Sequence, residues 1–312
     1  MRVLFWGTPA FAAPPLRALI GEGFEVCGVV TQPDKPQGRH RTVLPSPVKE
    51  IALAEGIPVL QPVTPRDPEF IQQCESMRPD ISVVVAYGHI LPKAVIDLPS
   101  EGTLNIHASL LPALRGAAPI QAALRQGLRE TGISIMRMVP ALDAGPVLLR
   151  CKTPIAGDET YGELRERLSE LGALALIEAL TLISIGQAPE VPQDSHLATY
   201  APKVTRETAR IDWTLDAREV VNIIRAYDPA PGAYTPYQGT DVKFFGAKPT
   251  LLSTPITPAP APGQVIATGE SFVVACGTGA VTITDVQPAG KKRMTTSQWY
   301  SGRGVTVGDV LT

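Results

Sequence analysis

Asn105 and His107 are the first residues of this sequence that suggest chemistry. They lie two apart in the stretch NIHASLLPALRG, residues 105–116, at the end of an apolar run. Residues i and i+2 of a strand face the same side of a sheet, so this spacing directs an amide and an imidazole to one place. An amide donates to a developing oxyanion, and an imidazole moves a proton or donates as imidazolium. The pair therefore suits an acyl-type transfer.

Asp143, in the LDAG of residues 142–145, is the third candidate, because an aspartate orients and charges a neighbouring histidine. The sequence has no G-x-S-x-G motif and no cysteine in a nucleophile's setting, so direct transfer between two bound substrates is favoured over a covalent intermediate. Each residue also has a structural interpretation. His107 suits the polar end of a strand, and Asn105 and Asp143 suit turns in which they bond their own backbone. Spacing alone leaves both interpretations open.

Strands that end together are needed to bring these residues into contact. Apolar runs begin near residues 2, 25, 81, 102, 132 and 146 (RVLFWG, EVCGVVTQ, ISVVVAYG, GTLNIHAS, GISIMRMV and PVLLRCKT), with helical patterns over 10–21 and 91–98. Nearly all-apolar strands alternating with helices predict an α/β fold, a Rossmann-like and mostly parallel sheet covered on both faces. Ligands bind at the carboxyl ends of such strands, where Asn105 and His107 fall.

The second half of the chain has a different pattern. An amphipathic helix over 161–185 is followed by the Pro- and Gln-rich GQAPEVPQDSHLATYAPK, by a helix over 216–227, and by the short β runs DVKFFGA, GQVIAT, SFVVACG and AVTITDVQP. Short strands bounded by glycine or proline predict a small C-terminal OB-like β-barrel, a type that often binds oligonucleotides. We expect a catalytic domain over 1–188, a linker over 189–206 and the barrel domain over 207–312.

Composition narrows the class of protein. With 44% hydrophobic and 19% charged residues among 312, the chain is typical of globular proteins. No apolar run reaches the ~20 residues that span a bilayer, and MRVLFWGTPAF suits a first strand better than a signal peptide. A cytoplasmic protein without a membrane partner is therefore expected. Four scattered cysteines predict neither a disulfide framework nor a metal site. The net charge of -2 means that any nucleic-acid contact comes from local basic clusters. Nothing demands more than a monomer.

The chain resembles the folate-dependent formyltransferases. The resemblance lies in N-x-H-x-S-L-L-P-x-x-R-G-x-x-P, from Asn105 to Pro119, and in the L-D-x-G of Leu142 to Gly145. Further similar stretches are GTPAFA (7–12), TQPDKPQGR (31–39), LPSPVK (44–49), VVVAYGHILPKAV (83–95), RGAAPIQ (115–121), ARIDW (209–213) and QPAGKKRM (287–294). The Asn/His/Asp set is shared by all relatives that use formyltetrahydrofolate. TQPDKPQGR, PSPVK, ARIDW and the C-terminal domain resemble the tRNA-dependent branch.

The resemblance implies a reaction and a folate site. The formyl group of 10-formyltetrahydrofolate passes to the α-amino group of methionyl initiator tRNA, for translation initiation, without a metal. Asn105 and a protonated His107 stabilise the oxyanion, and Asp143 favours the charged imidazole and helps to remove the amine proton. The residues that match the family's folate pocket are Tyr87, Gly88, His89, Ile90, Leu91, Pro92, Ser109, Leu110, Leu111 and Pro112.

The resemblance also implies two regions that contact tRNA. The segment from Asp34 to Lys49 is too polar and too broken by turn residues to pack as core, and in relatives it meets the end of the acceptor stem. The matching residues here are Lys35, Arg39, Arg41 and Lys49, with Arg39 a key contact. The second region is Lys291, Lys292 and Arg293 on the barrel, with Lys203 and Arg206 near the linker. Binding through these charges is expected to be salt-sensitive.

Three other functions are compatible with parts of the sequence. A folate formyltransferase acting on a small amine, glycinamide ribonucleotide or an amino sugar, shares the core motif but leaves the barrel and the 34–49 segment without a purpose. A non-enzymatic RNA-binding protein would use His107 for binding alone. A dinucleotide oxidoreductase is suggested by the leading strand, but WGTPAF lacks the G-x-G-x-x-G turn that binds a pyrophosphate.

Overall fold

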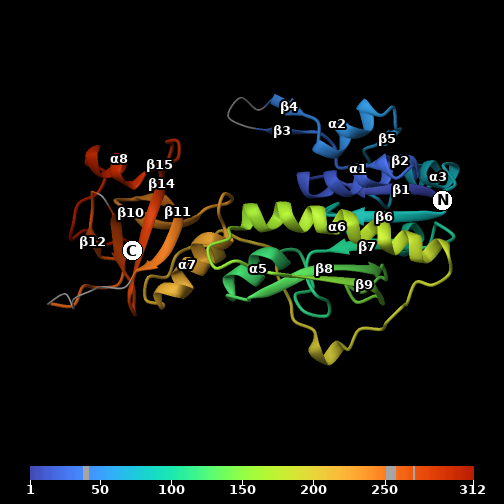
Figure 1. Ribbon diagram of the computed structural model, residues 1–312. Coiled ribbons are helices and arrows are strands. Elements are labelled where there is room, and N and C mark those ends of the chain that lie inside the picture. The colour runs from blue at the N-terminus through green and yellow to red at the C-terminus, as the bar shows by residue number, and fades with distance from the viewer. Residues whose placement is uncertain (38–41, 251–257, 270) are drawn as a thin grey trace. The chain divides into compact units, whose positions relative to one another are not determined.

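The chain forms two compact units in the computed structural model, which describes residues 1–37, 42–250, 258–269 and 271–312 (Figure 1). The first unit comprises residues 1–116, 130–154 and 165–201, and the second comprises 117–129, 155–164 and 202–312. Each unit is therefore built from three separate segments of the chain. The expected domain limits at 188 and 206 stay a prediction.

A seven-stranded sheet forms the centre of the first unit, in the order β5-β2-β1-β6-β7-β8-β9. The strands are β1 (Arg2–Gly7), β2 (Glu25–Val30), β5 (Val59–Leu60), β6 (Ile81–Val85), β7 (Thr103–His107), β8 (Glu130–Arg137) and β9 (Val147–Pro154). The first five are parallel, whereas β8 pairs antiparallel with both β7 and β9. This confirms the expected α/β fold with a mostly parallel sheet.

Helices cover the sheet of the first unit. They are η1 (Ala10–Ala12), α1 (Ala13–Gly21), α2 (Pro47–Ala54), α3 (Pro68–Ser76), α4 (Lys93–Ile96) and α6 (Tyr161–Ser184), with η2 (Ser195–Leu197) near the end of the unit. Helix α6 packs closely on the sheet at Gly172. A Cβ added to this glycine would lie only 3.1 Å from the side chain of Ile106 in β7. Proline at the first helical position and a side-chain cap, as at Ser46–Pro47 and Asp67–Pro68, explain where α2 and α3 begin.

The 34–49 segment contains regular structure where the sequence predicted only a polar loop. Strands β3 (Lys35–Gln37) and β4 (Thr42–Leu44) form a two-stranded antiparallel hairpin, and α2 starts at Pro47. Two three-residue strands are too short to show alternation in the sequence, which is why the hairpin was missed. Of the predicted contacts, Arg39 and Arg41 lie outside the described residues.

A curled antiparallel sheet forms the half-barrel of the second unit, as the OB-like prediction required. Its order is β10-β11-β14-β13-β12, with β15 paired to β14. The strands are β10 (Ala233–Tyr237), β11 (Thr240–Thr250), β12 (Val265–Ala267), β13 (Phe272–Ala275), β14 (Ala280–Pro288) and β15 (Met294–Thr295). The helices are α5 (Pro119–Arg125), η3 (Glu207–Ala209), α7 (Ala217–Ala226) and α8 (Thr296–Ser301).

Aromatic side chains fill the core of the second unit. Phe244 lies at the centre, with ring centroids 5.9 Å from Trp213, 6.5 Å from Phe272 and 6.2 Å from Trp299. Capping boxes fix the starts of α7 and α8. Within the described residues, no helix of either unit is both long enough and apolar enough to cross a membrane.

Candidate active site

Strand β7 carries Asn105 and His107 at its carboxyl end. Asn105 lies beside Val84 of β6 and Met136 of β8, and His107 lies beside Ser134 of β8. Asn105 is half-buried, whereas His107 is only 5% exposed. Both residues lie inside the strand rather than in the turn after it, so the pairing of β7 with two neighbours fixes their common face. Among the described residues, the side-chain amide of Asn105 has no hydrogen-bond partner.

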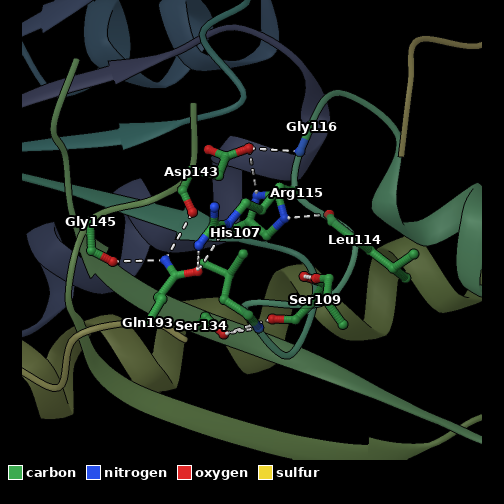
Figure 2. A network of polar contacts seen from close by, with 11 residues as sticks. His107, Ser109, Leu114, Arg115, Gly116, Ser134, Asp143, Gly145 and Gln193 are labelled. Atoms are coloured by element: carbon green, nitrogen blue, oxygen red, sulfur yellow. Dashed lines mark hydrogen bonds and ion pairs between the residues drawn. The ribbon is translucent and has the colours of Figure 1, made fainter. Parts of the chain in front are cut away.

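The His107 ring lies between two oxygen acceptors (Figure 2). Its Nε2 is 2.9 Å from the carbonyl oxygen of Leu114, and its Nδ1 is 3.7 Å from Oδ2 of Asp143. A carbonyl oxygen only accepts, so the bond to Leu114 places a proton on Nε2. The Asp143 carboxylate faces Nδ1 from the other side of the ring. The geometry therefore fixes the orientation of the imidazole between a carbonyl oxygen and a carboxylate.

The Asp143 carboxylate is fixed by the backbone of Gly116, whose N–H donates to Oδ2 at 2.8 Å (Figure 2). Gly116 has a φ of 117°, and a Cβ there would lie 2.6 Å from the carbonyl oxygen of Ala201. Asp143 itself has a φ of 47°, in the left-handed region that non-glycine residues rarely adopt. The turn after β7 and the turn after β8 thus meet at this carboxylate.

Gln193 joins the same two turns and was missed by the sequence analysis. Its Nε2 donates to the carbonyl oxygens of Asp143 and Gly145 at 2.8 and 2.7 Å. Its Oε1 accepts from Nη2 and Nε of Arg115 at 2.8 and 3.1 Å (Figure 2). Arg115 is 5% exposed, so Gln193 supplies an acceptor for two nitrogens of a buried guanidinium. No motif marks Gln193, which lies in the Pro- and Gln-rich segment that was expected to be a linker.

The predicted folate residues 109–112 form a turn that is bonded to β8. Ser134 Oγ donates to the carbonyl oxygen of Ser109 at 2.7 Å and accepts from the Leu111 N–H at 3.0 Å. Leu111 is buried, whereas Leu110 and Pro112 are half-buried. Arg150 Nε also donates to the Leu111 carbonyl oxygen at 2.8 Å. These bonds occupy the main chain of the turn and fix its shape.

The predicted folate residues 87–92 follow β6. Tyr87 and Leu91 are 1% and 3% exposed, and Tyr87 packs edge-on against Trp6. Burial raises the pKa of Tyr87 to about 12, and its hydroxyl has no hydrogen-bond partner in the part of the chain that the structure describes. These two side chains belong to the core. Of the remaining four residues, Gly88, His89 and Ile90 are exposed and Pro92 is half-buried.

The predicted tRNA contacts fall into two groups. Lys35, Lys203, Lys291 and Lys292 are exposed. The other three described residues pair with carboxylates: Lys49 with Asp34 at 2.5 Å, Arg206 with Asp241 at 2.6 Å and Arg293 with Asp228 at 2.9 Å. Of these three, Lys49 is half-buried, whereas Arg206 and Arg293 are also exposed. Arg293 also lies over the ring of Phe245, 4.2 Å from its centroid. Within the described residues, no group of His, Cys, Asp and Glu side chains is arranged to hold a metal.

Comparison with known proteins agrees with this fold. Residues 1–180 match the model of the family described as formyl transferase, and residues 203–304 match that of the formyl transferase C-terminal domain. The chain therefore belongs to the formyl transferase family, as the sequence motifs predicted. A methionyl-tRNA formyltransferase of Moorella thermoacetica is 46% identical over 100% of this chain and 99% of its own length. Another, from Bacillus velezensis, is 45% identical over 99% of this chain and 97% of its own.

Two solved structures share the fold at low identity. HypX from Aquifex aeolicus in complex with tetrahydrofolic acid has a TM-score of 0.69 and 21% identity, covering 100% of this chain and 50% of that one. A methionyl-tRNA formyltransferase from Clostridium thermocellum has a TM-score of 0.55 and 13% identity, covering 80% of this chain and 94% of that one. The family and the full-length relatives make this protein a formyl-transferring enzyme.

Proposed function

We propose that the protein transfers the formyl group of 10-formyltetrahydrofolate to the α-amino group of methionyl initiator tRNA, as a step in translation initiation. The observation that carries the proposal is similarity across both units to relatives named methionyl-tRNA formyltransferase. The Asn105–His107–Asp143 arrangement is consistent with that reaction. The folate supplies a formyl group that an amine can attack.

Asn105 is the side chain best placed to stabilise the oxyanion. As the neutral amine adds to the formyl carbon, the formyl oxygen gains negative charge. The Asn105 amide is available to donate to that oxygen, because no described residue occupies it. Loss of one such donor typically lowers turnover by about 10²–10³.

His107 and Asp143 act together in the proposed mechanism. Both ring nitrogens of His107 face protein oxygens, so its first contribution is a ring held in a fixed orientation close to the reacting group. The separation of 3.7 Å between Nδ1 and Asp143 is longer than a hydrogen bond, so Asp143 does not occupy this nitrogen, which is proposed to interact with a substrate oxygen. The Asp143 carboxylate accepts the proton that the amine loses on acylation, directly or through water. As the oxyanion collapses, the bond between the formyl carbon and N10 of the folate breaks, and N10 takes up that proton as tetrahydrofolate leaves.

Folate and tRNA are proposed to bind at the predicted residues. For folate these are Tyr87 to Pro92 and the turn from Ser109 to Pro112. For tRNA they are Lys35, Arg39, Arg41, Lys49, Lys203, Arg206, Lys291, Lys292 and Arg293. We further propose a cytoplasmic monomer without a metal or a membrane partner, with domain limits at 188 and 206. The small-amine alternative would leave the half-barrel without a substrate to contact.

The test is transfer of labelled formyl from 10-formyltetrahydrofolate to methionyl initiator tRNA, with methionyl elongator tRNA in parallel. Efficient formylation of the initiator alone is expected. Formylation of a small amine with neither tRNA labelled would contradict the proposed substrate while retaining the chemistry. Absence of formyl transfer to any amine would contradict the reaction itself.

A further inference from the structure

The base of the β3–β4 hairpin is held by a polar cluster that the proposed mechanism does not use. Lys49 Nζ donates to Asp34 Oδ2 at 2.5 Å and to Gln61 Oε1 at 2.8 Å. Gln61 Nε2 donates to Asp34 Oδ1 at 2.7 Å and to the carbonyl oxygen of Gln32 at 3.0 Å. The Lys49 and Asp34 side chains are only 19% and 24% exposed. The cluster therefore fixes the backbone where the hairpin begins.

Gln32 connects this cluster to the segment that follows β6. Its Nε2 donates to the carbonyl oxygen of Tyr87 at 2.9 Å, and its Oε1 accepts from Nζ of Lys35 at 2.7 Å. Lys35 is the first residue of β3. Thr8 Oγ1 accepts from the Gln32 N–H at 3.2 Å and donates to the same Tyr87 carbonyl at 3.3 Å. One amide thus bonds to the hairpin on one side and to the 87–92 segment on the other.

Gly88 shows how closely these segments approach each other. A Cβ on Gly88 would lie 2.4 Å from Nε2 of Gln32, nearer than atoms of side chains can approach. Gly88 has a φ of 89°, a conformation that glycine adopts without strain. The backbone at Gly88 therefore turns directly around the Gln32 amide, and a change in that amide is transmitted to the main chain of the segment.

We infer that Gln32 is a positioning residue that couples the hairpin to the 87–92 segment, so that folate affinity responds to what the hairpin contacts. The inference rests on the proposed function, in which the hairpin meets tRNA and the 87–92 segment holds folate. A tRNA phosphate that binds Lys35 removes that lysine from Gln32. Because coupling between binding sites is reciprocal, folate then alters tRNA affinity by the same factor.

The first test separates the two bonds of Gln32. Gln32→Glu keeps an acceptor for Lys35 but has no N–H for the Tyr87 carbonyl. The dissociation constant of tetrahydrofolate, measured by titration calorimetry without tRNA, is expected to rise about threefold to tenfold, the effect of losing one hydrogen bond. Gln72→Glu makes the same chemical change on the exposed face of α3 and is expected to leave that constant unchanged.

The second test distinguishes coupling from a loss of stability. Lys35→Ala is compared in the native chain and in Gln32→Ala, with thermal unfolding of all four proteins as a check on folding. Lys35→Ala is expected to change the tetrahydrofolate dissociation constant about twofold or more in the native chain and not at all in Gln32→Ala. A general structural effect would act equally in both backgrounds. If Gln32→Glu does not fold, this comparison is sufficient alone.

The outcomes separate this inference from the proposed function. An unchanged dissociation constant in a folded Gln32→Glu protein, or equal effects of Lys35→Ala in both backgrounds, overturns the coupling and leaves formyl transfer intact. A native protein that neither binds tetrahydrofolate nor formylates methionyl initiator tRNA overturns the proposed function, and the coupling with it.

Discussion

The proposed catalytic residues and the proposed tRNA contacts are held in different ways. His107 is 5% exposed, and both its ring nitrogens face protein oxygens, while Asp143 is bonded to the Gly116 backbone. Lys203 and Lys292, by contrast, are exposed and have no ion-pair partner among the described residues. Most buried polar groups are satisfied by their neighbours, and where they are, as at His107 and Asp143, the fold determines their position. An exposed lysine is satisfied by water and is positioned by its ligand.

Arg293 and Lys49 depart from this division. Both were predicted as tRNA contacts, yet Arg293 pairs with Asp228, which is buried, and Lys49 pairs with Asp34. A basic residue in a motif therefore has two possible roles, and only its partners distinguish them. For these two residues the structural role is supported by the contacts. Variants can test whether the division between buried and exposed groups holds.

The largest effect is expected at Asp143. In Asp143→Asn the side-chain oxygen still accepts from Gly116, but the negative charge beside His107 is lost. Turnover at saturating substrates should fall by about 10²–10³, while both substrates still bind. The measurement is kcat for formyl transfer, with dissociation constants for tetrahydrofolate and tRNA. Glu166→Gln, a change at an exposed carboxylate, is the control. Full turnover in Asp143→Asn would remove it from the catalytic group.

The next effect is on stability, at Arg293. Arg293→Met leaves the carboxylate of Asp228, which is 8% exposed, without its closest cation. Breaking a fully buried ion pair costs about 3–5 kcal/mol, and the 40% exposure of the Arg293 side chain lowers the expectation to about 1–3 kcal/mol. Urea unfolding measures the change.

Lys292→Met is the matched control for Arg293→Met, because it removes a neighbouring exposed charge. It should leave the free energy of unfolding unchanged. If the two variants have the same free energy of unfolding and Arg293→Met weakens tRNA binding more than Lys292→Met does, Arg293 is an RNA contact rather than a structural residue.

Most of the fold was predictable from sequence because long apolar runs dominate it. Strand β6 is buried throughout, and β7 carries the motif, so both were identified. The β3–β4 hairpin and α5 were missed, since neither is long enough to show a clear period. The reversal of β8 against β7 was also not predictable, because pairing direction leaves no local pattern.

The candidate site was predictable only in part. Asn105, His107 and Asp143 have motif spacing, whereas Gln193 acts on Asp143 and Gly145 from about fifty residues further along the chain. Only the fold brings that amide to Arg115. The burial of Tyr87 was likewise hidden, because Y-G-H-I-L-P does not reveal which side chains turn inward. Contacts between distant segments are the part that sequence patterns do not encode.

A smaller effect is expected at the exposed lysines. Lys292→Ala should weaken tRNA binding about threefold to tenfold and lower the slope of log K against log salt by about 0.7–0.9, the value of one phosphate contact. The measurement is tRNA affinity at several salt concentrations. Lys152→Ala removes an equal charge from β9 and should change neither quantity. Equal responses of the two variants would mean that net charge, rather than a contact at Lys292, governs binding.

The smallest effect concerns a buried polar contact in the second unit, and it tests whether that contact contributes to the free energy of unfolding. Tyr237 donates to Asp309 at 2.6 Å, and burial together with that carboxylate raises the pKa of Tyr237 to about 12 from an ordinary 10.0. A pKa raised on folding means that the contact stabilises the protein below pH 10 and that this stabilisation is lost as pH rises from 10 to 12. Tyr237→Phe should therefore lower the free energy of unfolding by about 1 kcal/mol at pH 8 and flatten its alkaline decline. Urea unfolding of both proteins at pH 8 and 11 measures this. An alkaline decline of the same size in Tyr237→Phe would show that groups other than Tyr237 set it.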